Sequence, residues 1–107
     1  MKTVVKENAN GGKGQVVVKY ILDDNELNAK CKMFAEVTIA PGCSLGYHEH
    51  GESETYYIIK GQGEYDDNGT KRPVTVGDKT FTPDGWGHGI ANTGDEDLVF
   101  MALIQLD

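Results

Sequence analysis

The chain has 107 residues, 38% of them hydrophobic and 25% charged, which predicts one globular domain with a modest core. A formal net charge of −7 argues against nucleic acid as a partner, because an acidic chain repels phosphate backbones. The start is polar and glycine-rich, without the apolar stretch of a secretory signal, and the uncharged run at 98–106 is too short to span a bilayer. We therefore expect a cytoplasmic protein with no membrane partner.

Glycine and proline divide the chain into short runs rich in β-branched and aromatic residues, which predict strands. In chain order, the expected strands are Val16–Leu22, Met33–Ala40, Gly46–His50, Thr55–Lys60, Gly63–Tyr65, Val74–Val76, Thr80–Thr82, His88–Asn92 and Leu98–Gln105. Only 23–29 offers a helical turn, and Asp67-Asn68-Gly69 fits a type I′ hairpin. Many short strands predict an all-β sandwich or barrel.

The two halves of the chain resemble each other weakly. Each has a strand, a Pro/Gly turn and then a strand that carries histidine. Two related β-halves that close on each other are typical of a double-stranded β-helix, or jelly roll.

The last expected strand, Leu98–Gln105, is apolar at both odd and even positions. A strand that is apolar on both faces is usually covered on both sides. We therefore expect a homodimer whose interface lies over the outer face of this strand, with a closely packed monomer as the alternative.

The two cysteines, Cys31 and Cys43, allow one disulfide, although two reduced thiols are the simpler expectation for a cytoplasmic protein. Their spacing is not that of a CxxC zinc site.

All three histidines fall in two short segments. His48 and His50 are two residues apart, so on a strand both imidazoles project from the same face, and Glu49 projects from the other. Such a pair also occurs on ordinary protein surfaces, so it does not by itself establish a metal site.

Two further residues can complete a site begun by these histidines. Glu54 opens the next expected strand, which as an adjacent strand would lie about 4.8 Å away, and His88 arrives from a separate strand. Imidazole and carboxylate donors suit divalent manganese, iron, cobalt, nickel or zinc. Four such ligands would leave an octahedral ion two open positions for water or substrate, which a catalytic metal site needs.

These residues stand in a known pattern. The segment 42–61 matches, at every fixed position, the first motif of the cupin family, G(x)5HxH(x)3-4E(x)6G. The segment 77–92 matches the second, G(x)5PxG(x)2H(x)3N, after a spacer of 15 residues. The chain therefore resembles a small single-domain cupin spanning 1–107.

The resemblance implies a cupin jelly-roll barrel that holds one metal ion through His48, His50, Glu54 and His88, with a small-molecule ligand inside the barrel. It also implies a dimer, as small members commonly are. The motif glycines 42, 61, 77 and 85 are expected to serve turns, and Asn92 to fix a turn rather than touch a ligand.

Several residues flank the expected ligands. Tyr56 shares the parity of Glu54, so it either lies near the metal or is a core aromatic. By the same argument Ile58 and Ile90 line the cavity. Tyr47 and Trp86 either rim the pocket or simply pack.

The resemblance also bears on the substrate. Oxalate-cleaving cupins carry an arginine three residues before the first ligand histidine, and Leu45 stands there in this chain. The only arginine, Arg72, is expected at the surface. Without that guanidinium a bidentate partner for a small dicarboxylate is missing, which argues against oxalate decarboxylase chemistry.

Three functions are compatible with this sequence. The leading hypothesis is a metal-dependent enzyme, of dioxygenase, isomerase or decarboxylase type, that acts on a small oxygenated substrate. A non-catalytic binding module for a sugar or organic acid is the alternative, and a sensor is the least favoured because no DNA-binding helices are present. Beyond the ligands, Tyr56 and Glu52 are the candidate catalytic residues.

Overall fold

The computed structural model describes residues 1–49 and 51–106. Its elements, in chain order, are β1 (Lys2–Glu7), η1 (Ala9–Gly11), β2 (Gln15–Tyr20), α1 (Asp24–Leu27), β3 (Cys31–Ile39), β4 (Ser44–Glu49), β5 (Ser53–Lys60), β6 (Gln62–Asp67), β7 (Thr70–Thr75), β8 (Lys79–Thr82), β9 (Gly87–Asn92) and β10 (Leu98–Gln105). The expected all-β class is confirmed. The helical turn expected at 23–29 is α1, which a capping box formed by Asp23 and Glu26 closes at its start.

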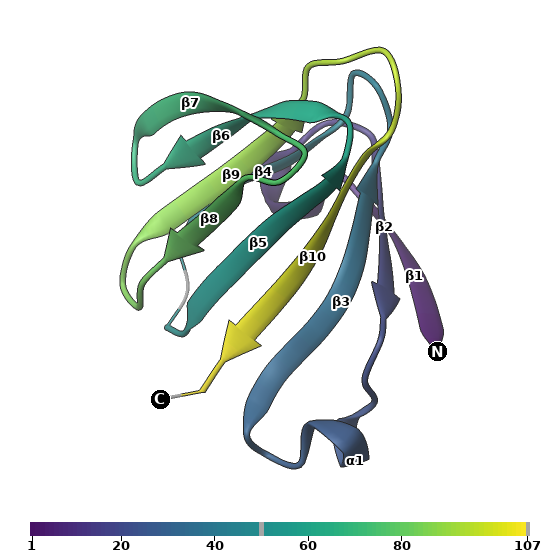
Figure 1. Ribbon diagram of the computed structural model, residues 1–107, viewed down its shortest axis with the longest axis vertical. Helices are drawn as coiled ribbons and strands as arrows, with labels where there is room; N and C mark the ends of the chain where they lie inside the picture. The colour runs from purple at the N-terminus through teal and green to yellow at the C-terminus, as the bar shows by residue number, and fades with distance from the viewer. Residues whose placement is uncertain (50, 107) are drawn as a thin grey trace.

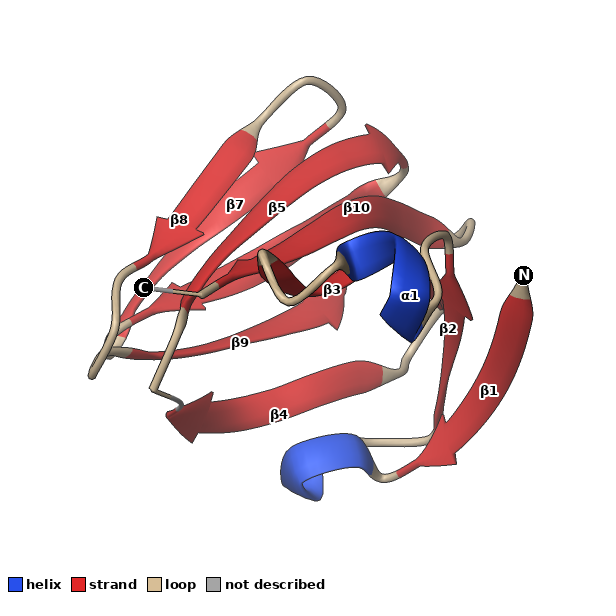
Figure 2. Cartoon of the chain, turned by 90° about the horizontal axis from the view of Figure 1, so that it is seen from below, coloured by secondary structure: helices blue, strands red, loops and turns tan. Residues whose placement is uncertain are grey.

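The strands form two antiparallel sheets that face each other. The six-stranded sheet has the order β1-β2-β3-β10-β5-β8 and the four-stranded sheet has the order β4-β9-β6-β7. Each sheet contains strands from both halves of the chain, as a jelly roll requires (Figure 1). Figure 2 shows the edge strands β1 and β4 on the same open side of the barrel, with η1 between them.

The core lies between the two sheets and is built from the inward-facing residues of their central strands. Its fully buried apolar members are Val16, Ala35, Ile39, Ile58, Tyr65, Leu98, Phe100 and Ala102. The alternation is clearest in β3, where every second residue from Ala35 to Ile39 is buried.

The hairpin between β6 and β7 confirms the expected type I′ turn. Asn68 and Gly69 both have positive φ, at 50° and 98°. The hairpin extends from Gln62 to Thr75, so β7 begins four residues before the strand expected at Val74. The four motif glycines also have positive φ, between 78° and 90°.

The sequence did not predict β1, which pairs with β2 in antiparallel register from Lys2–Tyr20 to Glu7–Gln15. Its segment is polar, and an edge strand needs an apolar pattern on only one face. Cys31 and Cys43 are free, as expected.

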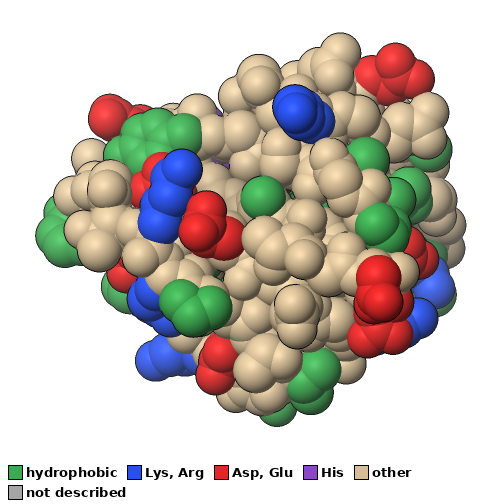
Figure 3. Space-filling view, turned by 90° about the horizontal axis from the view of Figure 1, so that it is seen from above, with side chains coloured by type: hydrophobic (Ala, Val, Ile, Leu, Met, Phe, Trp, Pro, Cys, Tyr) green, Lys and Arg blue, Asp and Glu red, His purple; other side chains and the backbone are tan. Residues whose placement is uncertain are grey.

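In the described chain, no helix is long and apolar enough to cross a membrane. On the face shown in Figure 3, the basic side chains stand apart and are interspersed with acidic ones.

Candidate metal centre

His48 lies on β4, and a backbone contact fixes its imidazole. A register shift between Leu45 and His48 bends the strand and sets His48 opposite His88 on β9. The Nδ1 of His48 lies 2.8 Å from the Gly46 carbonyl oxygen. Because a carbonyl can only accept, Nδ1 carries the proton, and Nε2 keeps a lone pair that can bind a metal.

His88 is fully buried on β9, and its ring centroid lies 4.7 Å from that of His48. Its Nδ1 lies 2.8 Å from the Tyr65 hydroxyl and 3.0 Å from the Thr82 hydroxyl, which also contact each other. Its Nε2 lies 2.9 Å from Oε1 of Glu54. Either hydroxyl oxygen can accept a hydrogen bond from a proton on Nδ1, which leaves Nε2 as the candidate ligand atom.

Glu54 reaches the two histidines from the opposite sheet. The sequence suggested a strand adjacent to that of His48, but β5 belongs to the six-stranded sheet, where it pairs with β8 and β10. The chain crosses between sheets after β4, so the carboxylate approaches across the barrel interior rather than along a sheet. Glu54 is buried, with 4% of its surface exposed.

The donor atoms of His48, Glu54 and His88 all lie within 4.8 Å of one another. Two ligands on opposite sides of an ion, each at about 2.1 Å, would be about 4.2 Å apart, so only small movements would seat an ion here. Two neutral imidazoles and a carboxylate are also the right chemistry for a first-row divalent ion. The residues therefore fit a metal ion.

The fourth expected ligand, His50, lies outside the described residues. It stays a prediction, based on its parity with His48. Glu49, expected to project away from the site, is exposed.

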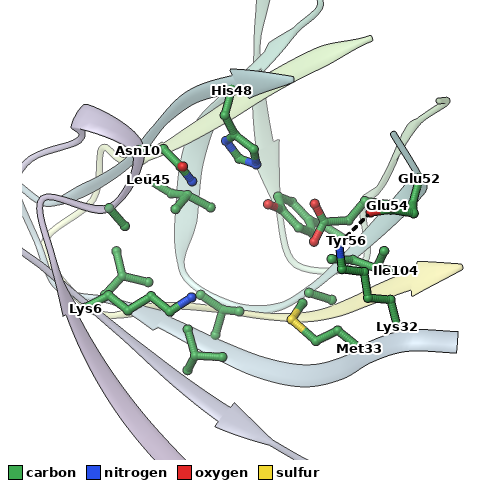
Figure 4. Close-up of a pocket in the computed structure, with 15 residues that line it drawn as sticks. Lys6, Asn10, Lys32, Met33, Leu45, His48, Glu52, Glu54, Tyr56 and Ile104 are labelled. Carbon is green, nitrogen blue, oxygen red and sulfur yellow. Dashed lines mark hydrogen bonds and ion pairs between the residues drawn. The ribbon is translucent and has the colours of Figure 1, made fainter. Parts of the chain in front are cut away.

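A cavity of about 230 Å³ opens beside the metal centre inside the barrel. His48, Glu54 and Tyr56 line it at one end, and its remaining walls are largely apolar (Figure 4). The apolar wall residues are Ala9, Val16, Val18, Met33, Val37, Leu45, Ala102 and Ile104. The arrangement is that of a ligand pocket with a few polar groups at fixed points.

Comparison with known proteins settles the family. The cupin domain family matches residues 35–104, about two thirds of the chain. This chain belongs to the cupin family. The jelly-roll barrel expected from its two motifs is thereby confirmed.

Two proteins of Thermotoga maritima resemble this chain over most of its length. This cupin is 44% identical over 100 residues to an "Oxalate-binding protein", covering 92% of this chain and 83% of the relative. It also resembles the crystal structure of a "predicted oxalate decarboxylase", with a TM-score of 0.95 and 41% identity over 100% of this chain and 94% of that one.

A more distant similarity covers less of the molecule. A "Glucose-6-phosphate isomerase" of Thermococcus onnurineus is 34% identical over 67 residues, which is 57% of this chain but only 35% of the isomerase. That match is therefore confined to one part of a longer protein.

Tyr56 faces the barrel interior, and the two interpretations left open for it both hold in part. It packs in the core against Phe100, at 4.3 Å between ring centroids, and stacks on His88 at 5.0 Å. Burial, together with the nearby Glu54 carboxylate, raises the pKa of its phenol well above 10. Tyr56 is thus a neutral hydrogen-bond donor beside the site, not a base.

The remaining expectations are resolved by position. Ile58 and Ile90 are buried in the core and are not among the cavity-lining residues, so the expectation that they line the cavity is wrong: they face inward, but toward the packed core. Tyr47 and Trp86 are exposed and are not among the cavity-lining residues. Asn92 fixes a turn, since its side chain bonds the backbone of residues 39, 94 and 96.

Arg72 does not replace the arginine that oxalate-cleaving cupins carry. It lies on β7, 3.8 Å from Asp67 and over the Tyr65 ring, and it does not line the cavity, whereas Leu45 does. The other candidate, Glu52, lies at the cavity mouth, where it pairs with Lys32 at 3.0 Å.

Sequence reasoning missed two groups of residues near the site. Tyr65 and Thr82, which hold His88, are outside the fixed motif positions, so no spacing signal pointed to them. Tyr65 comes from another strand, and Thr82, six residues before His88, is a variable position of the second motif. Lys6 and Asn10 line the cavity from the polar N-terminal segment. The only hint in the sequence was that Lys6 is two residues from Val4, so that on a strand the two side chains project from the same face.

Proposed function

We propose that this cupin holds one divalent transition-metal ion through His48, His50, Glu54 and His88, and binds a small organic acid at that ion. The observation that carries the proposal is the convergence of three donor atoms at the end of a barrel cavity. Oxalate is the first acid to test, because the Thermotoga maritima relative is named for binding it.

The donor set accepts manganese, iron, nickel or zinc, since imidazole and carboxylate bind all four. When bound, such an ion supplies Lewis acidity that attracts carboxylate oxygens to its open positions. Around it, the chain's own groups are arranged for a small acid: Tyr56 is a neutral donor, and Leu45 closes the wall where an arginine is missing.

A metal-dependent enzyme of dioxygenase, isomerase or decarboxylase type is the second candidate function. The specific observation in its favour is Tyr56, whose buried phenol keeps its proton beside Glu54 and could donate it to a bound substrate. Glu52 is the other candidate, although its carboxylate pairs with Lys32 at the cavity mouth.

Calorimetric titration with oxalate tests the first proposal. We expect binding to the manganese- or zinc-loaded protein and none to the metal-free protein, and His48→Ala to abolish it. Glu49→Ala, which changes an exposed neighbour, is the matched control. Oxalate binding that is equal with and without metal would overturn the proposal.

The same loaded protein decides between the two candidates. Release of formate and carbon dioxide from oxalate, or turnover of a sugar or keto-acid panel, would support the enzyme. Binding without turnover would support the non-catalytic module.

We also propose that two copies of the chain pair through the outer face of the six-stranded sheet. This face carries Met101 and Leu103 of β10, next to half-exposed Tyr57, Ile59 and Phe81. Large apolar side chains gathered on one exposed sheet face are typical of an interface.

A further inference from the structure

A lysine side chain that lines the cavity, Lys6, has no role in the metal centre. Lys6 lies on the edge strand β1 opposite Val16, a fully buried residue of β2, so its side chain projects from the inner face of the sheet. Figure 4 shows its amine end pointing into the cavity, which His48 enters from the other side.

Lys6 differs from the second lysine at this cavity. Lys32 is neutralised by Glu52, at 3.0 Å. Within residues 1–49 and 51–106, Lys6 has no carboxylate within 4.0 Å, so its ammonium is available to a ligand. Lys6 is exposed, and the inward row of β1 to which it belongs is Lys2, Val4 and Lys6, so the lysine stands at the rim of the cavity and keeps its charged end in water.

From these positions we propose that Lys6 binds the distal carboxylate of a dicarboxylic acid longer than oxalate, whose proximal carboxylate lies at the metal centre. This inference rests on the proposed function and assigns its ligand class. The apolar wall between the two ends, which includes Val18, Val37 and Leu45, suits a methylene segment.

Size and charge both favour such a ligand. A cavity of about 230 Å³ corresponds to about eight waters at their liquid volume of about 30 Å³, more room than a two-carbon acid needs. A divalent ion, the Glu54 carboxylate and the Lys6 ammonium leave two net positive charges, which a dicarboxylate dianion balances.

Calorimetry on the zinc-loaded full chain tests the inference with two ligand series: oxalate, malonate, succinate and glutarate, and the monocarboxylates acetate, propionate, butyrate and valerate. We expect one of the longer dicarboxylates to bind about fivefold or more tightly than the monocarboxylate of equal chain length, as an ion pair at a half-open site allows. This preference should shrink in high salt.

Lys6→Gln should remove that preference while leaving zinc affinity and oxalate affinity unchanged, and Lys6→Arg should retain it. Lys13→Gln is the matched control, because Lys13 is exposed and does not line the cavity. Unchanged dicarboxylate preference in Lys6→Gln would overturn the role of Lys6 while the proposed function stands. If the wild-type protein binds no zinc, or binds none of the acids, the proposed function itself is contradicted.

Discussion

The two hydroxyl groups beside His88 hold its imidazole ready for a metal ion. Tyr65→Phe or Thr82→Val alone leaves His88 one hydroxyl partner, whereas the double variant removes both. Partners that orient a metal-binding histidine contribute about 10- to 100-fold to metal affinity. We therefore expect small losses of zinc affinity in the single variants and a loss of about that size in the double variant, measured by competition with a chelator.

Thr80→Val provides the control for these variants. Thr80 lies on the same strand as Thr82 and is buried, but within the described part of the chain its hydroxyl makes no hydrogen bond to His88. Its removal should leave zinc affinity unchanged. Equal affinities for the double variant and the wild type would show that the hydroxyls do not orient His88.

Tyr56 makes the stability of the fold sensitive to alkaline pH. Its folded-state pKa lies well above the ordinary value of 10.0, so the protonated phenol stabilises the fold fully below pH 10. As the pH rises from about 10 toward the folded-state pKa, the unfolded chain ionises first and stability falls by up to about 1.4 kcal/mol per pH unit. Urea unfolding should show a steeper alkaline loss in the wild type than in Tyr56→Phe, which keeps Tyr65, whose pKa burial also raises, and identical alkaline slopes would contradict the effect of Tyr56.

At the scale of single residues, the sequence predicted which candidate ligands lie together but not the groups that hold them. His48, Glu54 and His88 follow motif spacing, and the structure brings all three together. The contact of Tyr65 with His88 depends on which strands become neighbours, and the contact of His48 with the Gly46 carbonyl, two residues away on the same strand, depends on the side-chain rotamer, so neither could be read from spacing.

The contact between η1 and β4 holds the strand that carries His48. The backbones of the two elements approach so closely that a Cβ at Gly46 would collide with the Asn10 carbonyl oxygen. Gly46→Ala should therefore lower the free energy of unfolding by about 1–3 kcal/mol and weaken zinc binding, because it displaces the carbonyl that holds His48. Thermal unfolding and a zinc titration measure the two effects.

Gly51→Ala is the control for that variant, because a Cβ there would meet no atom closer than 4.0 Å. If Gly46→Ala keeps wild-type stability, η1 does not pack on β4 as described.

At the scale of elements, strands with apolar alternation and the Asn-Gly hairpin were predictable. The edge strand β1 and the first residues of β7 were not, because polar residues at a sheet edge pair through their backbones without an apolar signature. The crossing of the chain from β4 to β5 was also missed, since strand order within a sheet depends on packing between distant segments.

At the scale of the whole molecule, the exposed apolar residues on the outer face of the six-stranded sheet predict a dimer in solution. Light scattering should give twice the chain mass for the wild type and the single mass for Tyr57→Glu, because the new charge would be buried at the interface. Val76→Glu, an exposed apolar position in the turn after β7, should remain dimeric. A monomeric wild type would contradict the proposed pairing.

The proposed site for one metal ion is formed by side chains from both sheets. Its most direct test is metal content per chain, measured by elemental analysis after equilibration with manganese, iron, nickel or zinc and removal of excess. We predict one ion per wild-type chain and none in a folded His88→Ala variant. If none of the four metals binds, or if the metal content of His88→Ala equals that of the wild type, these residues do not form a metal site.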